Sequence, residues 1–234
     1  MKNLIIASTS TLHGGAYLDY LLPTIENHFK DCETILFIPY ARPGGITHDE
    51  YTNKVKDAFG KINKKVVGLH EYKHPKEAVE NAQGIFIGGG NTFLLVTQLY
   101  QNNVMETLAK VIENGTPYLG SSAGSNITGI SMQTTNDMPI IYPPSFKTLG
   151  VIPFNLNPHY LDADLHSKHM GETRETRIKE FHAFNETPVL GLREGSWLDV
   201  KGDKIILKGT LTARLFKQNQ EPIELESGFD LGLI

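Results

Sequence analysis

The sequence predicts an α/β fold in which a doubly wound, mostly parallel sheet is sandwiched between helices and followed by C-terminal antiparallel hairpins. Two observations support this fold class. Through the first two-thirds of the chain, short apolar runs alternate with longer amphipathic stretches, as expected for strands joined by right-handed helical crossovers. The runs are continuously apolar rather than alternating, which is typical of strands buried on both faces. A three-layer sandwich is therefore expected.

The first elements are defined by apolar spacing and by the residues that break it. Residues 4–7 form a brief apolar run, and residues 18–29 carry apolar side chains at helical spacing. The next predicted strand, 34–38, ends at Pro39 and at the Pro-Gly-Gly loop 43–45. These segments predict the opening strand–helix–strand unit of the sheet.

The same pattern continues to about residue 120. Pro75 begins a short predicted helix, where its missing N–H costs nothing. The predicted helices of this part are 48–59, 75–82 and 93–113, and the predicted strands are 65–69, 85–87 and a run ending at 118–119.

Beyond about residue 130 the pattern changes. Residues 134–157 are rich in Pro and Asn, which predicts a loop with short strands. Residues 172–184 are predicted to form a helix. From residue 187 onward the sequence predicts strands joined by tight turns such as 201–203.

The composition is that of an ordinary globular protein. Of 234 residues, 40% are hydrophobic and 21% are charged, which excludes a disordered, collagen-like or disulfide-stapled chain. No linker rich in Ser, Gly or Pro divides the sequence, so a single α/β domain over residues 1–234 is predicted. Two small domains are the alternative that the length leaves open.

Charge and cysteine content narrow the partners and the compartment. The chain carries 22 Lys and Arg against 26 Asp and Glu with no basic run, which argues against binding to duplex nucleic acid. Cys32 is the only cysteine, which excludes an internal disulfide and fits a reducing compartment. The apolar run at 4–7 is too short for a signal peptide or a membrane span. We expect a cytoplasmic protein without nucleic-acid or membrane partners.

A glycine-rich segment at 120–124 follows the fifth predicted strand, at the sheet edge where α/β proteins bind ligands. It matches G-x-S-x-G, the nucleophile elbow of a strand–turn–helix. The sharp turn requires small residues two before and two after its exposed centre, and only Ser122 has glycine at both places. The Ala123 amide at the helix N-terminus could face a developing oxyanion. A Gly/Ser-rich turn that only caps a helix is the alternative.

A second glycine-rich segment, 88–92, follows the fourth predicted strand and opens a helix. The amides of Gly89 and Gly90 could supply the second oxyanion donor, as glycine-rich loops do in hydrolases. A phosphate cradle is the other interpretation, but the G-x-G-x-x-G and P-loop spacings are both absent. A plain tight turn accounts for one glycine better than for three.

Among nine histidines, His159 is the candidate base for a hydroxyl nucleophile. It follows Asn157 and Pro158, and the proline stiffens the approach to the imidazole. A buried, hydrogen-bonded histidine is the alternative. His182 is expected to pack in its helix. The histidines expected to be solvated are His28, His48, His70 and His74.

A divalent metal site is a competing interpretation of the same region. Acidic and imidazole side chains crowd within ten residues of His159, which can mark a metal centre. The H-E-x-x-H spacing is absent, and such loop clusters are more often solvated. The residues concerned are Asp162, Asp164, His166 and His169.

Six segments, in order over most of the chain, resemble the peptidase E family, the α-aspartyl dipeptidases, whose fold is like that of class I glutamine amidotransferases. The segments are 88–92 (GGGNT), 120–124 (GSSAG), 136–139 (NDMP), 157–160 (NPHY), 171–175 (GETRE) and 191–197 (GLREGSW). The sequence departs from the family pattern at two places. Ser121 stands where a bulky aromatic is common, and Arg193 precedes Glu194.

The resemblance implies a serine exopeptidase that hydrolyses dipeptides with N-terminal aspartate through an aspartyl-enzyme. Ser122 would be the nucleophile and His159 the base. Both Glu194 and Asp137 match family positions for the acid that orients the imidazole. We favour Glu194, with Asp137 supporting the site or binding substrate.

Substrate contacts are expected from Asn91 and Arg174. Selectivity for aspartate needs a fixed cation, for which Arg174 is the candidate, although an exposed helical arginine is the alternative. No metal or organic cofactor is expected, the partner is a small aspartyl dipeptide, and the protein would act as a monomer or homodimer. The alternatives are a metal-dependent hydrolase using the cluster at 159–169 and a catalytically inactive amidotransferase-like binding subunit.

Overall fold

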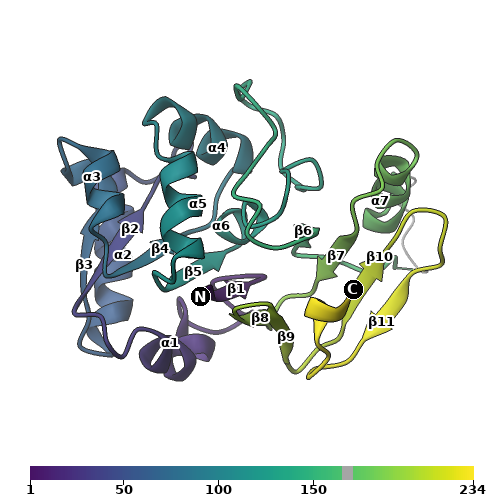
Figure 1. The fold of residues 1–234 in the computed structure, drawn as a ribbon, viewed down its shortest axis with the longest axis horizontal. Helices are drawn as coiled ribbons and strands as arrows, with labels where there is room; N and C mark the ends of the chain where they lie inside the picture. The colour runs from purple at the N-terminus through teal and green to yellow at the C-terminus, as the bar shows by residue number, and fades with distance from the viewer. Residues whose placement is uncertain (165–170) are drawn as a thin grey trace.

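The computed structural model describes residues 1–164 and 171–234 and contains two sheets that lie side by side (Figure 1). The main sheet has seven strands in the order β3-β2-β4-β5-β1-β8-β9. The smaller sheet has four strands in the order β11-β10-β7-β6. The α/β class, the mostly parallel main sheet and the C-terminal antiparallel hairpins that the sequence predicts are therefore confirmed.

The elements have the following bounds. The strands are β1 (Asn3–Ala7), β2 (Thr34–Ile38), β3 (Lys65–Gly68), β4 (Gly84–Ile87), β5 (Tyr118–Ser121), β6 (Asn155–Pro158), β7 (Val189–Leu192), β8 (Ser196–Lys201), β9 (Lys204–Gly209), β10 (Ala213–Phe216) and β11 (Ile223–Leu225). The helices are α1 (Leu22–His28), α2 (His48–Gly60), α3 (Pro75–Glu80), α4 (Thr92–Gln101), α5 (Met105–Glu113), α6 (Ala123–Asn126) and α7 (Arg174–His182).

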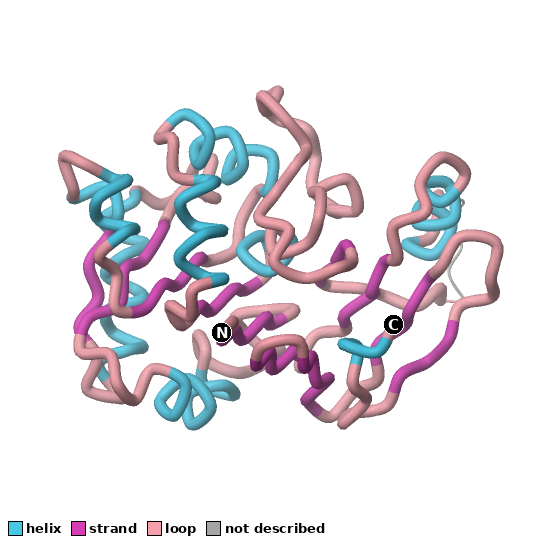
Figure 2. Tube along the Cα trace, in the orientation of Figure 1, coloured by secondary structure: helices cyan, strands magenta, loops and turns pink. Residues whose placement is uncertain are grey.

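Helices cover both faces of the main sheet, as Figure 2 shows with helices in cyan around magenta strands. On one face, apolar side chains of β1, β2 and β4 pack with those of α3, α4 and α5. On the other face, the alternate side chains of the same strands pack with α1 and α2. Because successive side chains of a strand point to opposite faces, strands buried on both sides are continuously apolar, as the sequence predicted.

Parallel pairing brings the carboxyl ends of three central strands together. Ala7 of β1 is paired with Ser121 of β5, and Ile87 of β4 is paired with Gly120 of β5. The residues that follow these strands, among them Ser8 and Ser122, therefore meet at one edge of the sheet.

Two predicted helices differ in detail from the structure. The predicted helix 93–113 is two helices, α4 and α5, because Asn103 adopts a left-handed conformation with φ of 55° and ends the first one. The predicted helix 18–29 begins with a 3-10 turn at Asp19–Leu21, after Leu18 with φ of 61°.

The second sheet is a feature that the sequence did not predict. The segment before it is irregular up to residue 154, with one isolated bridge between Ser131 and Lys147. Strand β6 then pairs in parallel with β7, while β10 pairs antiparallel with both β7 and β11. No helix within residues 1–164 or 171–234 has the length and apolar character needed to cross a membrane.

Of the four histidines expected to be solvated, His28 is buried and two others are only partly exposed. Only His74 is exposed, while His48 and His70 are half-buried. His28 is 7% exposed, and its Nε2 lies 3.1 Å from the Tyr118 carbonyl oxygen, to which it donates. The packing expected of His182 is confirmed, because it is also 7% exposed.

The turn from β5 into α6 requires its glycines for steric reasons. A Cβ on Gly124 would lie 2.1 Å from the Ile87 carbonyl oxygen, and one on Gly120 would lie 2.6 Å from the Gly124 carbonyl oxygen. Both contacts are with backbone atoms, which cannot move aside as a flexible side chain can. The small residues predicted on either side of Ser122 are thus required by close backbone packing.

Burial of His28 should make the free energy of unfolding depend on pH. Burial lowers the pKa of His28 from 6.5 to about 3, so the folded protein keeps this ring neutral while the unfolded chain protonates it below pH 6.5. The unfolded state then binds the extra proton, and acidification favours it by up to about 1.4 kcal/mol per pH unit. Urea unfolding of wild type and of His28→Gln, which keeps an N–H donor, should show this extra slope in wild type between about pH 6 and about pH 4. Parallel curves would contradict it.

Gly124→Ala should destabilise the fold by about 1–3 kcal/mol or more, because the added methyl overlaps the Ile87 carbonyl. Gly44→Ala is the matched control, since a Cβ there has nothing within 4 Å. The control should change the free energy of unfolding by less than about 0.5 kcal/mol. Chemical denaturation of both variants tests this, and equal stability of the two would disprove the steric argument.

Candidate active site

Ser122 stands at the sharp turn between β5 and α6. Its backbone has φ of 55° and ψ of −112°, an unfavourable conformation for a residue with a side chain. The turn is held by its surroundings: the Ser122 N–H donates to the Ala7 carbonyl over 3.2 Å, and the Ser122 carbonyl accepts from Ser125 and Asn126. Strand pairing on one side and a helix on the other therefore hold the hydroxyl at the carboxyl edge of the sheet.

His159 follows β6 directly and also has a positive φ, of 55°. Its N–H donates to the Ser8 hydroxyl oxygen over 2.9 Å, and the Ser8 hydroxyl donates to the Leu192 carbonyl over 2.7 Å. Ser8 is fully buried. One hydroxyl at the end of β1 thus holds the start of the His159 loop against the end of β7.

The imidazole of His159 lies between Ser122 and Glu194. Its Nε2 is 2.8 Å from Ser122 Oγ, and its Nδ1 is 2.6 Å from Glu194 Oε1. With the ring proton on Nδ1, donated to the carboxylate, Nε2 accepts the hydrogen bond of the serine hydroxyl. This arrangement is the one required for a base that activates a hydroxyl nucleophile and is itself oriented by an acid. The side chains of His159 and Glu194 are 37% and 46% exposed, so the base is not a buried histidine.

Asp137, the other acid that the sequence left open, lies at a different place. Its Oδ2 accepts hydrogen bonds from the Thr92 N–H at 2.7 Å, the Thr92 hydroxyl at 2.6 Å and the Thr135 hydroxyl at 3.1 Å. Within the described residues, it makes no hydrogen bond to His159. Asp137 therefore caps the N-terminus of α4, where a negative charge is favoured.

Gly89 lies directly against the Ser122 side chain. A Cβ on Gly89 would be 2.8 Å from Ser122 Cβ and 3.3 Å from its Oγ. The Tyr51 hydroxyl donates to the Gly89 carbonyl over 3.2 Å and so fixes the peptide that carries the Gly90 N–H. The Ala123 N–H begins α6, and the first amides of a helix have no acceptor within it. Gly89 thus lies against the Ser122 side chain, and Ala123 follows Ser122 directly in the chain.

A small pocket opens beside Ser122. It is lined by Thr92, Ser122, Ala123, Asn126, Thr135, Asn136, Asp137, Pro158 and His159. Arg174 is half-buried at the start of α7. Its pKa is lowered, chiefly by burial and also by the charge of Arg177, while the charge of Asp137 opposes this shift. The charge of Asp137 thus acts on Arg174, which lines a separate pocket with Asp162, Gly171 and Arg177 rather than the one beside Ser122.

Asn91 was expected to bind substrate, but both ends of its side chain have structural partners. Its Oδ1 accepts from the Leu94 N–H at 3.1 Å, which caps α4, and its Nδ2 donates to the Met138 carbonyl at 2.8 Å. Asn91 therefore caps α4 and holds the loop that carries Asp137 and Met138. The geometry gives no support for a substrate contact.

The cluster considered for a metal is described only in part. His166 and His169 lie outside the described residues. Asp162 forms an ion pair with Arg193 at 2.7 Å. Among residues 1–164 and 171–234, no group of three or more His, Cys, Asp and Glu side chains has the arrangement of a metal site.

The two departures from the family pattern have different surroundings. Ser121 is fully buried, and its hydroxyl has no hydrogen-bond partner in the part of the chain that the structure describes. Arg193 turns its side chain to Asp162 and Glu224. The hydrogen bonds of its guanidinium are thus made to these acids and to Thr212, and not to Glu194.

Sequence reasoning missed the residues that support the site. Ser8 joins the two sheets, Thr92 and Thr135 hold Asp137, and Tyr51 holds the Gly89 carbonyl. Ser8 had a usable signal, because it directly follows an apolar strand at the edge where Ser122 also lies. Tyr51 and Thr92 had none, since their contacts join segments far apart in the sequence, whereas Thr135 lies only two residues before Asp137.

Comparison with known proteins identifies the family. The model of peptidase family S51 matches residues 4–208. Peptidase E of Streptomyces coelicolor is 47% identical over 98% of this chain and 93% of its own length. A Drosophila melanogaster protein named "Probable alpha-aspartyl dipeptidase" is 46% identical over 98% of this chain and 96% of its own. The crystal structure of a peptidase from an acI-B1 actinobacterium shares the fold, with a TM-score of 0.71 and 16% identity over 99% of this chain and 96% of that one. The chain belongs to peptidase family S51.

Proposed function

We propose that this protein is a serine-type dipeptidase that hydrolyses dipeptides with N-terminal aspartate. The single observation that carries the proposal is the hydrogen-bonded series Ser122–His159–Glu194, at 2.8 Å and 2.6 Å. The names of its relatives, peptidase E and alpha-aspartyl dipeptidase, support the substrate class.

In the proposed reaction, Ser122 Oγ attacks the carbonyl carbon of the aspartyl residue while His159 Nε2 takes the hydroxyl proton. Glu194 stabilises the imidazolium that forms. The N–H groups of Ala123 and of Gly89 or Gly90 hold the oxyanion, and loss of one such donor typically lowers turnover ~10²–10³-fold. His159 then gives the proton to the leaving amine as the C–N bond breaks. In the second half, His159 takes a proton from water, which attacks the aspartyl ester, and returns it to Ser122 Oγ as aspartate leaves.

An N-terminal aspartate would be held by one charge of each sign, from Asp137 in the pocket beside Ser122 and from Arg174, which lines a separate pocket. Asp137 uses only Oδ2 in its hydrogen bonds to described residues, so Oδ1 is available to the α-ammonium group. Arg174 has no ion pair among the described residues, and its partial burial strengthens attraction to the aspartate side chain. Holding both groups would confine the enzyme to the first residue of a peptide.

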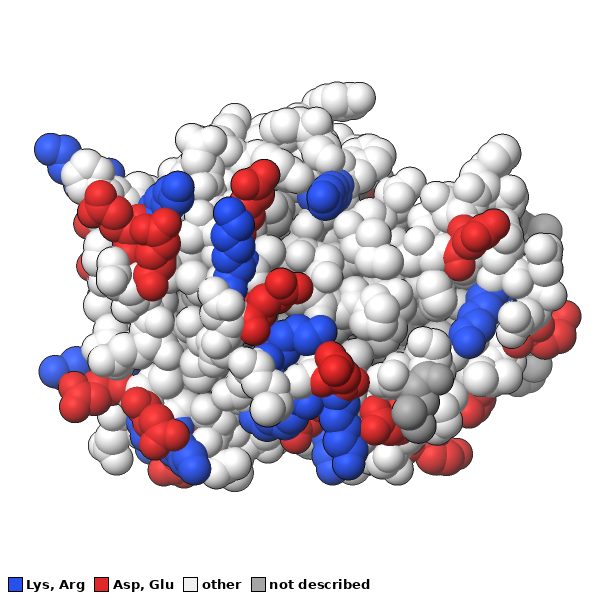
Figure 3. Space-filling model, viewed as in Figure 1, with Lys and Arg blue, Asp and Glu red and all other residues white. Residues whose placement is uncertain are grey.

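The setting proposed for this activity is a single domain that acts in the cytoplasm as a monomer or homodimer. The core formed by the main sheet continues into side chains of β7 and β10, which supports one domain. The lone Cys32 is buried, which fits a reducing compartment. On the face drawn in Figure 3, basic and acidic side chains are interspersed, which does not favour a nucleic-acid partner.

Turnover of Asp-Leu should separate the roles of the three polar residues. Ser122→Ala should abolish hydrolysis, and Glu194→Gln should lower kcat by about 10²–10⁴-fold because the imidazole loses its charged partner. Asp137→Asn should act chiefly through a higher KM, since its charge would bind the substrate amine. Unchanged turnover in Ser122→Ala would end the serine hypothesis. Loss of wild-type activity in EDTA would favour a metallohydrolase instead.

Arg174→Met should lower kcat/KM for Asp-Leu by about 100-fold or more, because a desolvated carboxylate would lose its partner. We expect wild type to hydrolyse Asn-Leu only weakly, and the same variant should leave that rate nearly unchanged. Arg177→Met is the matched control on the same helix, where the side chain is exposed and lies 3.7 Å from Glu172. If both variants lose the same factor, or if Asn-Leu suffers equally, Arg174 does not recognise the aspartate.

A further inference from the structure

The contact between His159 and Glu194 cannot maintain its own geometry. Both side chains are more than a third exposed, and exposed ion pairs gain little because water screens them and flexible side chains must be ordered. The two residues also come from different strand ends, after β6 and after β7. Their separation therefore depends on how firmly those two backbones are held together.

The pairing of β6 with β7 ends just before His159 and Glu194. The last pair of the β6–β7 ladder is Pro158 with Leu192, and one further bond runs from the Tyr160 N–H to the Leu192 carbonyl at 3.2 Å. Beyond it, the connection is made by side chains. Arg193 Nε donates to Asp162 Oδ2 at 2.9 Å, and its Nη2 donates to Asp162 Oδ1 at 2.7 Å.

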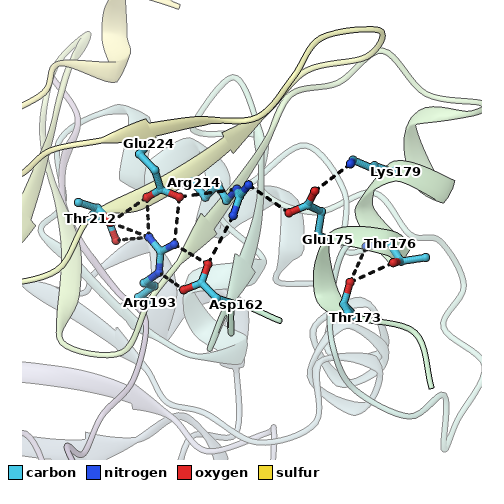
Figure 4. Close-up of polar contacts among 9 residues, drawn as sticks. All are labelled: Asp162, Thr173, Glu175, Thr176, Lys179, Arg193, Thr212, Arg214 and Glu224. Atoms are coloured by element: carbon cyan, nitrogen blue, oxygen red, sulfur yellow. Dashed lines mark hydrogen bonds and ion pairs between the residues drawn. The ribbon is translucent and has the colours of Figure 1, made fainter. Parts of the chain in front are cut away.

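The Arg193 guanidinium is fully occupied by this role (Figure 4). It also donates to both carboxylate oxygens of Glu224, at 2.9 Å and 3.1 Å, and to the Thr212 carbonyl at 3.1 Å. It lies 5.5 Å from the ring centre of Tyr160, and its side chain is only 14% exposed. Hydrogen bonding to Arg193 lowers the pKa of Asp162 and of Glu224. No N–H of this arginine is left for a substrate.

Two planar, two-bond contacts fix orientation as well as distance, which a single point charge cannot do. One of them holds Asp162, three residues after His159, and the arginine itself directly precedes Glu194. Figure 4 shows that Arg214 extends the same cluster, lying 3.6 Å from Asp162 and 3.3 Å from Glu175 of α7.

We propose that Arg193 is a positioning residue, which holds His159 and Glu194 at hydrogen-bonding distance by clamping Asp162 and Glu224 to the end of β7. The proposal rests on the proposed serine-peptidase function. Arg193 touches neither the substrate nor Glu194, and it acts only through the backbone that carries the acid and the base.

Kinetics with Asp-Leu provide the first test. Arg193→Met should lower kcat by about 10–100-fold, because a displacement near 1 Å can cost this much, while KM changes by less than about threefold. Arg193→Lys keeps the positive charge but lacks the planar guanidinium that makes two-bond contacts, so it should recover only part of the loss. Arg214→Met, from the same cluster, is the control and should keep kcat within about threefold of wild type. An equal fall in Arg214→Met would show general loosening of the small sheet and overturn the proposal.

A double-mutant cycle tests whether Arg193 acts through Glu194. In a Glu194→Gln background, Arg193→Met should lower kcat by less than about threefold further, because the contact it protects is already impaired. The full single-mutant loss in that background would overturn the proposal. If Arg193→Met does not fold, Asp162→Asn removes the same two-bond contact with little change in volume and takes its place.

A spectroscopic measurement makes the test independent of the substrate. The short Nδ1–H bond to Glu194 should give a low-field proton resonance that is absent from Glu194→Gln. Arg193→Met should broaden or remove this resonance, and Arg214→Met should retain it. Persistence of the signal in Arg193→Met would disprove the positioning role even if Asp-Leu is not a substrate. Failure of wild type to hydrolyse Asp-Leu would instead count against the proposed function alone.

Discussion

The site depends on one buried hydroxyl, that of Ser8, at the place where the two sheets meet. The proposed nucleophile belongs to the main sheet, whereas the proposed base and acid belong to the small sheet. Ser8, at the end of β1, accepts from the His159 N–H and donates to the Leu192 carbonyl. Because this hydroxyl is fully buried, loss of either bond would leave an unpaired polar group, which is costly. The relative placement of the two sheets is therefore fixed where the chemistry needs it.

Ser122 and His159 both have φ of 55°, a conformation that non-glycine residues seldom adopt. Such strain persists only where surrounding contacts determine the backbone more strongly than the local preference does. For Ser122 those contacts are the pairing of β5 with β1 and the start of α6, and for His159 they are Ser8 and the β6–β7 ladder. In this backbone conformation the two side chains meet, with His159 Nε2 at 2.8 Å from Ser122 Oγ.

The sequence predicted the parts of this site that depend on local sterics. Only Ser122 has glycine two before and two after it, and the structure explains why, because added side chains at Gly120 and Gly124 would meet backbone atoms. The choice between Glu194 and Asp137 needed coordinates, since both acids are distant from His159 in sequence. The second sheet and the burial of His28 were missed for the same reason: strand partners and histidine environments are decided by contacts between remote segments.

Because Glu194 is exposed, other parts of the structure must fix its orientation toward the His159 imidazole. A buried carboxylate is held by packing, and its attraction to the ring is little screened; Glu194, 46% exposed, has neither advantage. Orientation must then come from the chain on either side of it. Arg193 supplies it before Glu194 by binding two carboxylates, and the first bonds of β8 supply it after, where the Ser8 N–H donates to the Ser196 carbonyl at 3.1 Å. Ser8 contacts both sides of this turn, so the same residue that joins the sheets also limits the movement of the acid.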